Sequence, residues 1–74
     1  MKAEEVYRRH FKSLAEEFLD LHDREFKARF REIILNYIRA ELYMGLHVME
    51  IAKDVGLICE IAYFGAGGKW EDLV

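Results

Sequence analysis

Three histidines and one cysteine are the side chains of this sequence best suited to metal binding or nucleophilic catalysis. They are His10, His22, His47 and Cys59. None of them belongs to a CxxC motif or to a histidine pair four residues apart, which are the spacings typical of zinc sites. No pattern orients a histidine toward the Cys59 thiol, and no oxyanion loop is evident. We therefore predict a protein that is not an enzyme, with no catalytic residue, no metal site and no cofactor.

Basic side chains offer a second kind of chemistry, the binding of nucleic-acid phosphates. The candidates are six residues of the N-terminal half and one tyrosine: Arg8, Arg9, Lys12, Arg24, Lys27, Arg31 and Tyr63. Glutamates alternate with the basic residues at helical spacing, so we expect a solvated face of mixed charge. The same mixture of charges argues against binding to a membrane surface.

Length and composition limit the architecture that positions these residues. A chain of 74 residues predicts one small domain, yet 53% of this chain is hydrophobic and 14% is aromatic. We expect some of these side chains to face a partner, most simply a second copy of the chain, because a small interior has little room for them. A lone cysteine fits a reducing cytoplasm, and no apolar run reaches the roughly 20 residues that span a bilayer. A cytoplasmic protein without a membrane segment is therefore expected.

Two apolar stripes at helical spacing indicate a pair of helices. The first stripe comprises Tyr7, Phe11, Leu14, Phe18 and Leu21, and the second comprises Phe26, Phe30, Ile33, Tyr37, Ala40 and Met44. The five-residue step between the stripes predicts a turn at residues 21–23, with Asp23 as the cap of the second helix. One long helix over residues 2–44 is the alternative to this hairpin.

The second helix is apolar on more than one face. A helix that is apolar this far round must contact two structures, of which one is the first helix and the other is the C-terminal segment or a partner chain. Large apolar anchors supply most of the energy of an interface. We assign the partner interface to three residues of this helix and to three aromatic residues near the C-terminus: Ile34, Ile38, Leu42, Tyr63, Phe64 and Trp70.

Glycines divide the C-terminal half of the chain. Gly45 is expected to end the second helix in a left-handed conformation. A short helix over residues 48–55 should follow, and Gly56 should end it. Residues 57–64 suit either a helix or a strand, and a lone strand would have to pair with the same strand of another copy.

Residues 45–57 resemble the helix-turn-helix superfamily of transcription regulators and recombinases. There, a stretch like Gly-Leu-Ser-Val-x-Glu-Ile-Ala-x-x-Leu-Gly-Ile introduces the helix that reads DNA. This chain matches it at Gly45, Leu46, Val48, Glu50, Ile51, Ala52, Val55, Gly56 and Leu57, and departs from it at His47 and Ile58. The resemblance implies a close helix crossing at Ala52 and a left-handed turn at Gly56.

The residues after this motif argue against DNA recognition. The resemblance places Cys59, Glu60 and Tyr63 at the exposed reading positions, and none of them reads base edges well, although Tyr63 can contact a phosphate. Residues 46–74 carry two basic residues against five acidic ones, a balance that repels a phosphate backbone. We predict an all-α fold, a helical hairpin followed by a helix-turn-helix-like segment. We expect it to act as an interaction module, as a homodimer or through a protein partner. A DNA-binding transcription regulator is the alternative.

Overall fold

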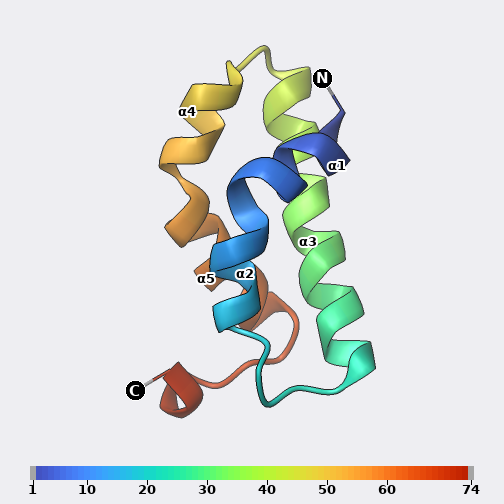
Figure 1. Cartoon of the computed structure of the whole chain (residues 1–74), viewed down its shortest axis with the longest axis vertical. Coiled ribbons are helices and arrows are strands. Elements are labelled where there is room, and N and C mark those ends of the chain that lie inside the picture. Colours follow the sequence, from blue (N-terminus) through green and yellow to red (C-terminus); the bar gives the residue numbers. More distant parts are fainter. Residues whose placement is uncertain (1, 74) are drawn as a thin grey trace.

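The computed structural model describes residues 2–73, and in that range it contains helices and turns but no strand. The helices are α1 (Ala3–Val6), α2 (Lys12–Glu17), α3 (Arg24–Tyr43), α4 (Val48–Lys53) and α5 (Val55–Gly65) (Figure 1). A π-helical segment, Tyr7–Phe11, joins α1 to α2, and a 3-10 turn, Trp70–Leu73, follows α5. The all-α prediction is confirmed. The alternative of a strand over residues 57–64 is wrong, because these residues lie within α5.

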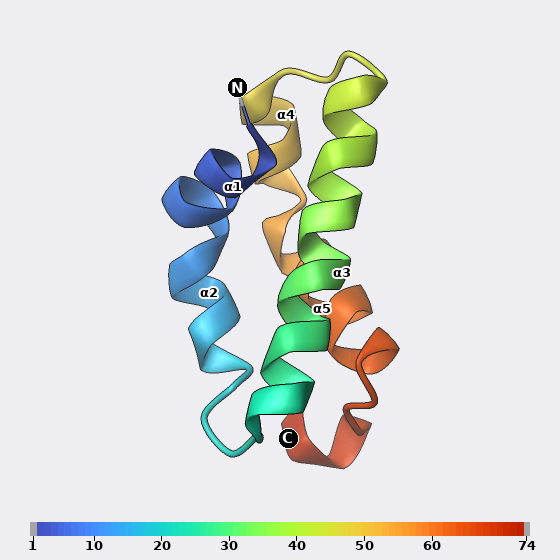
Figure 2. The same cartoon turned by 90° about the vertical axis from the view of Figure 1, so that its right-hand side faces the viewer.

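The helices form a bundle of three antiparallel legs. The chain runs down the N-terminal leg (residues 3–17), up α3, and down the α4–α5 leg (residues 48–65) (Figures 1 and 2). The 20 residues of α3 span about 30 Å, close to the 34 Å length of the molecule. Each of the three legs contacts the other two, so the helices enclose one common core.

The π-helical segment keeps one side of the N-terminal leg facing the core. Val6 and Phe11 are both fully buried although they are five residues apart, and Ala15 and Leu19 continue the inward row. An α-helix does not place residues five apart on one side, so the wider turn supplies the extra residue that lets both face the core. Leu21, which we predicted to end the first apolar stripe, is instead 95% exposed in the hairpin loop.

Both ends of α3 follow the sequence prediction. At its start, Oδ1 of Asp23 accepts a hydrogen bond from the Phe26 backbone N–H at 2.8 Å. At its end, Gly45 has a φ of 88°, and the N–H groups of Gly45 and Leu46 donate to the last carbonyls of the helix. This is a glycine cap of the Schellman type. The two-helix hairpin is confirmed, and a single helix over residues 2–44 is excluded.

The α4–α5 leg breaks at Asp54 and not at Gly56. The helix predicted over residues 48–55 ends at Lys53, and α5 begins directly after Asp54. The Ile58 N–H donates to the Asp54 carbonyl at 2.9 Å, so Gly56 already lies inside a right-handed helix. The left-handed turn predicted at Gly56 is therefore wrong. After the break, α5 continues down the molecule instead of folding back across α4 (Figure 1).

Candidate interaction surface

The six residues predicted to bind a partner divide into a buried group and an exposed group. Four of the six belong to the chain's own core. Three of these four are fully buried, Ile34, Ile38 and Tyr63, and Leu42 is half-buried against them. For these residues the prediction is wrong, because α5 and the N-terminal leg already cover the apolar faces of α3. Phe64 and Trp70 are 40% and 64% exposed, and these two remain available to a partner.

A row of apolar side chains follows the outer face of the α4–α5 leg. Its five members, which we call the outer row, are Met49, Leu57, Ile61, Phe64 and Trp70. Spacings of four and three residues place the three members in α5 on one side of that helix, while Ile58 and Ala62 pack into the core on the other side. The rings of Phe64 and Trp70 stack with centroids 6.2 Å apart, so the 3-10 turn extends the row.

Gly56 lies beside the outer row, and no contact or backbone angle within residues 2–73 requires glycine there. The other four glycines each have a reason: Gly45 and Gly67 have positive φ, a Cβ at Gly65 would press on Ile33, and a Cβ at Gly68 would overlap the Tyr63 ring. A Cβ at Gly56 would have no heavy atom within 4 Å among the residues that the structure describes. Glycine inside a helix costs about 0.5–1 kcal/mol relative to alanine, so Gly56 leaves an open spot at some expense of stability.

Two exposed charges of opposite sign accompany the outer row. Lys53 ends α4, and Glu60 lies in the middle of α5, seven residues further on and across the break at Asp54. Lys53 is the only basic residue in the sequence of residues 48–65. Within residues 2–73 the ion pairs are made by Arg39, with Glu4 and Glu32, and neither Lys53 nor Glu60 takes part in one. Both side chains are therefore free to meet a partner.

A second cluster, His22, Tyr63 and Asp72, fastens the C-terminal segment to the hairpin loop. The Tyr63 hydroxyl donates to Oδ2 of Asp72 at 3.4 Å and lies 3.0 Å from Nε2 of His22. Because the single phenolic proton points to Asp72, His22 donates its N–H to the phenolic oxygen. His22 also stacks on Phe26 with centroids 4.0 Å apart. The cluster thus joins the hairpin loop, α5 and the 3-10 turn.

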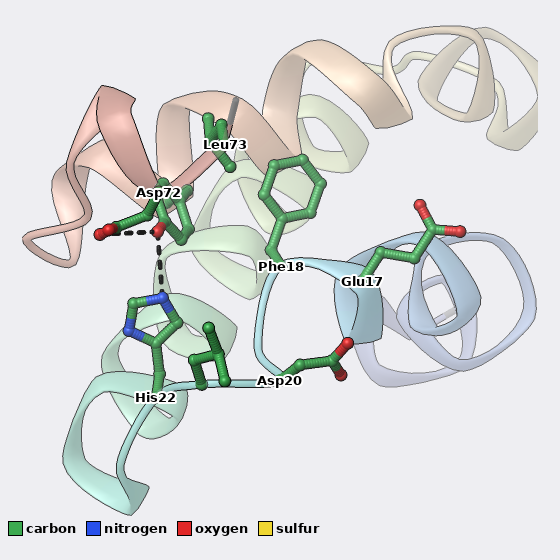
Figure 3. Close-up of a pocket in the computed structure, with 8 residues that line it drawn as sticks. Glu17, Phe18, Asp20, His22, Asp72 and Leu73 are labelled. Atoms are coloured by element: carbon green, nitrogen blue, oxygen red, sulfur yellow. Dashed lines mark hydrogen bonds between the residues drawn. The ribbon is translucent and has the colours of Figure 1, made fainter.

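A pocket of about 280 Å³ opens beside this cluster. It is lined by Glu17, Phe18, Asp20, Leu21, His22, Tyr63, Asp72 and Leu73. Figure 3 shows the His22 ring directed at the hydrogen-bonded pair, while the carboxylates of Glu17 and Asp20 point away from it. Burial, and secondarily the charge of Asp72, raises the pKa of Tyr63, so its hydroxyl remains a hydrogen-bond donor at neutral pH. The polar groups of His22, Tyr63 and Asp72 bond to one another, which indicates that the cluster holds the C-terminal segment in place.

The residues first considered for metal binding or catalysis lie apart from one another. His47 caps α4, where its Nδ1 accepts the Met49 N–H at 3.2 Å, in the place of the Ser or Thr of the helix-turn-helix pattern. Cys59 is fully buried, and burial raises the pKa of its thiol to about 11. His10 is half-buried on the N-terminal leg. Across residues 2–73, no three His, Cys, Asp or Glu side chains come together as a metal site would require.

Four of the predicted phosphate-binding residues meet around a groove between the N-terminal leg and α3. Arg8, Lys12 and Arg31 line one part of this groove, and Lys27 and Arg31 line the adjoining part. Glu16 borders both parts and moderates the positive charge. The remaining two basic candidates are exposed elsewhere: Arg9 and Arg24.

The positions expected to read DNA are mostly closed to solvent. Cys59 and Tyr63 are fully buried, and only Glu60 of that set is exposed. The prediction that Tyr63 contacts a phosphate is wrong, because its hydroxyl is held by His22 and Asp72 in the core. Because Gly56 makes no left-handed turn, α5 follows a different path from that of a reading helix. Cys59 and Tyr63 therefore face the core.

Comparison with known proteins leaves the chain without an identified relative. No protein-family model, no curated protein and no solved structure matches it. Membership of the helix-turn-helix superfamily therefore stays a prediction. None of the helices in the described range combines the length and the apolar character needed to cross a membrane.

Proposed function

We propose that this protein is a small helical interaction module whose binding surface is the outer row of the α4–α5 leg. One observation carries the proposal. Five large apolar side chains stay exposed along this leg and the 3-10 turn after it, and the three in α5 share one side of the helix, whose opposite side is well buried. Single exposed apolar residues are ordinary, but a continuous row on a small domain marks a contact surface.

The row has the composition of an interface core. Phe64 and Trp70 already stack on each other, so little side-chain freedom remains to be lost when a partner covers them. Leu57 is 59% exposed, and covering the rest of a leucine of this kind contributes about 1 kcal/mol. The aromatic pair is the expected anchor, because aromatic residues dominate the energetics of protein interfaces.

Site-specific photo-crosslinking tests this proposal. The photoreactive residue p-benzoylphenylalanine is placed at Leu57, and a matched control carries it at Ala28, an exposed residue of α3 away from the row. In cells that make the protein, we expect the Leu57 probe to give a defined adduct identified by mass spectrometry, and Ile61→Glu in the same chain to abolish it. Equal adduct yields at both positions, or no adduct at Leu57, would contradict the proposal.

A second candidate function is the binding of a nucleic-acid backbone by the basic groove, which four basic side chains around one depression favour. If each of the four contacts a phosphate, affinity for a random duplex should fall with salt with a logarithmic slope of about −3 to −4. Fluorescence anisotropy of a labelled duplex measures this slope. Arg31→Glu should weaken binding strongly, and Lys53→Glu, with the same charge change outside the groove, should leave it nearly unchanged. Absence of binding at low salt would remove this candidate.

A further inference from the structure

We infer that the partner of the outer row is a second copy of this chain, bound antiparallel about a two-fold axis that passes between Gly56 and Leu57. The inference rests on the proposed function and names the occupant of its surface. A two-fold dimer requires a face that is complementary to itself, because each residue meets its counterpart by symmetry. The α4–α5 leg has this property in one register.

In this register the apolar contacts match in size. Gly56 of one copy lies level with Leu57 of the other, so the leucine side chain fills the open spot that the glycine leaves. Met49 lies level with Phe64 of the other copy, and both are exposed members of the outer row. The register therefore gives Gly56 a function that no contact among the described residues gives it, which is close approach of another helix.

The charges select the same register. Lys53 of each copy lies level with Glu60 of the other, so the symmetric dimer contains this opposite-charge pair twice. Shifting the axis onto Leu57 would place Asp54 level with Glu60 of the other copy, and shifting it to Ile61 would place Lys53 level with Lys69. Both shifts bring like charges together, which disfavours them.

The size of the face sets the expected affinity. From Met49 to Phe64 the paired stretch is about 22 Å long at 1.5 Å per residue. A stable interface of standard size buries about 800 Å² on each partner, roughly a sixth of the 5182 Å² that this chain exposes. Two short helices and the Trp70 ring cover less than that. We therefore expect a weak, reversible dimer with a dissociation constant of micromolar order.

A charge-swap experiment tests the register. Sedimentation equilibrium measures the dissociation constant of the wild type, of Lys53→Glu, of Glu60→Lys and of the double variant. Each single variant creates two like-charge contacts and should weaken the dimer about tenfold or more, whereas the double variant should restore it to within about threefold of the wild type. Lys12→Glu, an equal charge change on the N-terminal leg, should have little effect. All three substituted positions are exposed, and circular dichroism serves to check that each variant is folded.

The possible outcomes separate this inference from the proposed function. A chain that stays monomeric up to about millimolar concentration, or a double variant no stronger than the single ones, overturns the two-fold dimer. If the Leu57 probe still crosslinks a different, identified protein, the interaction module stands with another partner. If the Leu57 probe gives no adduct and the chain is monomeric, both proposals fail together.

Discussion

One substitution made at two glycines should change the stability of this protein in opposite directions. Gly68 lies against the face of the Tyr63 ring, and a methyl group there would lie 2.6 Å from Cζ of Tyr63 and closer still to two other ring carbons. Gly56 lies in the first turn of α5, and a methyl group there would meet no heavy atom within 4 Å among residues 2–73. Comparison of Gly68→Ala with Gly56→Ala therefore separates the effect of packing on stability from the effect of helix propensity.

The expected magnitudes follow from the surroundings of each site. Tyr63 is fully buried, and the Phe18 and Phe26 rings lie 5.6 and 5.4 Å from its centroid, so a new methyl group would disturb this aromatic packing. Overpacking of this kind costs about 1–3 kcal/mol. Gly56→Ala removes backbone freedom from the unfolded chain without a clash, and it should gain about 0.4–1 kcal/mol.

Thermal unfolding followed by far-ultraviolet circular dichroism measures both changes. For a domain of this size, 1 kcal/mol shifts Tm by roughly 4–8 °C, so Gly68→Ala should lower Tm by about 5–20 °C and Gly56→Ala should raise it by about 2–8 °C. The protein should be dilute, at low micromolar concentration, so that the proposed dimer does not contribute. A repeat at a second low concentration checks this condition.

A double-mutant cycle identifies the cause of the Gly68→Ala effect. If the methyl group clashes with the Tyr63 ring, Gly68→Ala should cost much less in a Tyr63→Leu background, because leucine leaves the ring position empty. The reasoning is refuted if Gly68→Ala is neutral, if its cost is the same in both backgrounds, or if Gly56→Ala destabilises the monomer.

Three further predictions concern buried groups. Folding raises the pKa of Tyr63, so wild-type stability should fall above about pH 10, where the unfolded chain loses this proton first; urea unfolding of Tyr63→Phe should show a smaller fall. Cys59 is buried with a pKa of about 11, so native protein should resist Ellman's reagent near pH 8 and react once unfolded; rapid reaction of the native protein would contradict its burial. Burial, and then the charge of Asp54, raises the pKa of Glu41, whose Oε2 has no hydrogen-bond partner within the described residues. The contribution of Glu41 to stability should therefore decrease as pH rises above about 4, so Glu41→Gln should gain stability relative to the wild type over this range, up to about 1 kcal/mol at pH 7.

Local signals explain which features of the fold were predictable. Asp23 and Gly45 act through chemistry confined to their own neighbourhood, a side-chain oxygen for a free N–H and a backbone that tolerates positive φ. Both positions could therefore be predicted without knowledge of the tertiary structure. The step of five residues between the two stripes was equally local, and it located the hairpin loop.

The features that were missed depend on contacts between distant segments. A stripe through Tyr7, Phe11 and Leu14 describes a regular α-helix. Only the packing of the bundle shows that Phe11 shares the core with Val6 and Ala15 and not with Tyr7 and Leu14. The π-helical segment that reconciles them has no signal of its own beyond the five-residue step from Val6 to Phe11. The Asp54 break was likewise hidden, because glycine two residues later is the more usual helix terminator.

The His22–Tyr63–Asp72 cluster was missed for the same reason. Its members are separated by 41 and 9 residues, and nothing at any one of them indicates the others. Gly68 was the one local signal, because glycine is used where the backbone is approached closely by another group. The Tyr63 ring occupies that space, and this contact anchors the turn that brings Asp72 back to the hairpin loop.

The location of the interaction surface follows from how the apolar residues are shared out among three legs. The expectation that a chain this rich in apolar residues exposes some of them rested on composition, whereas the choice of face required knowing which side of each helix the other legs cover. The apolar side chains of α3 that we assigned to a partner, Ile34 and Ile38, are buried against the other two legs, while Tyr37 and Tyr43 of the same helix stay exposed. The α4–α5 leg also contacts both of the other legs, and Ile58 and Ala62 are buried there, but α5 carries large apolar side chains on its open side as well. These are Leu57, Ile61 and Phe64, and they lie on the surface that we propose a partner covers.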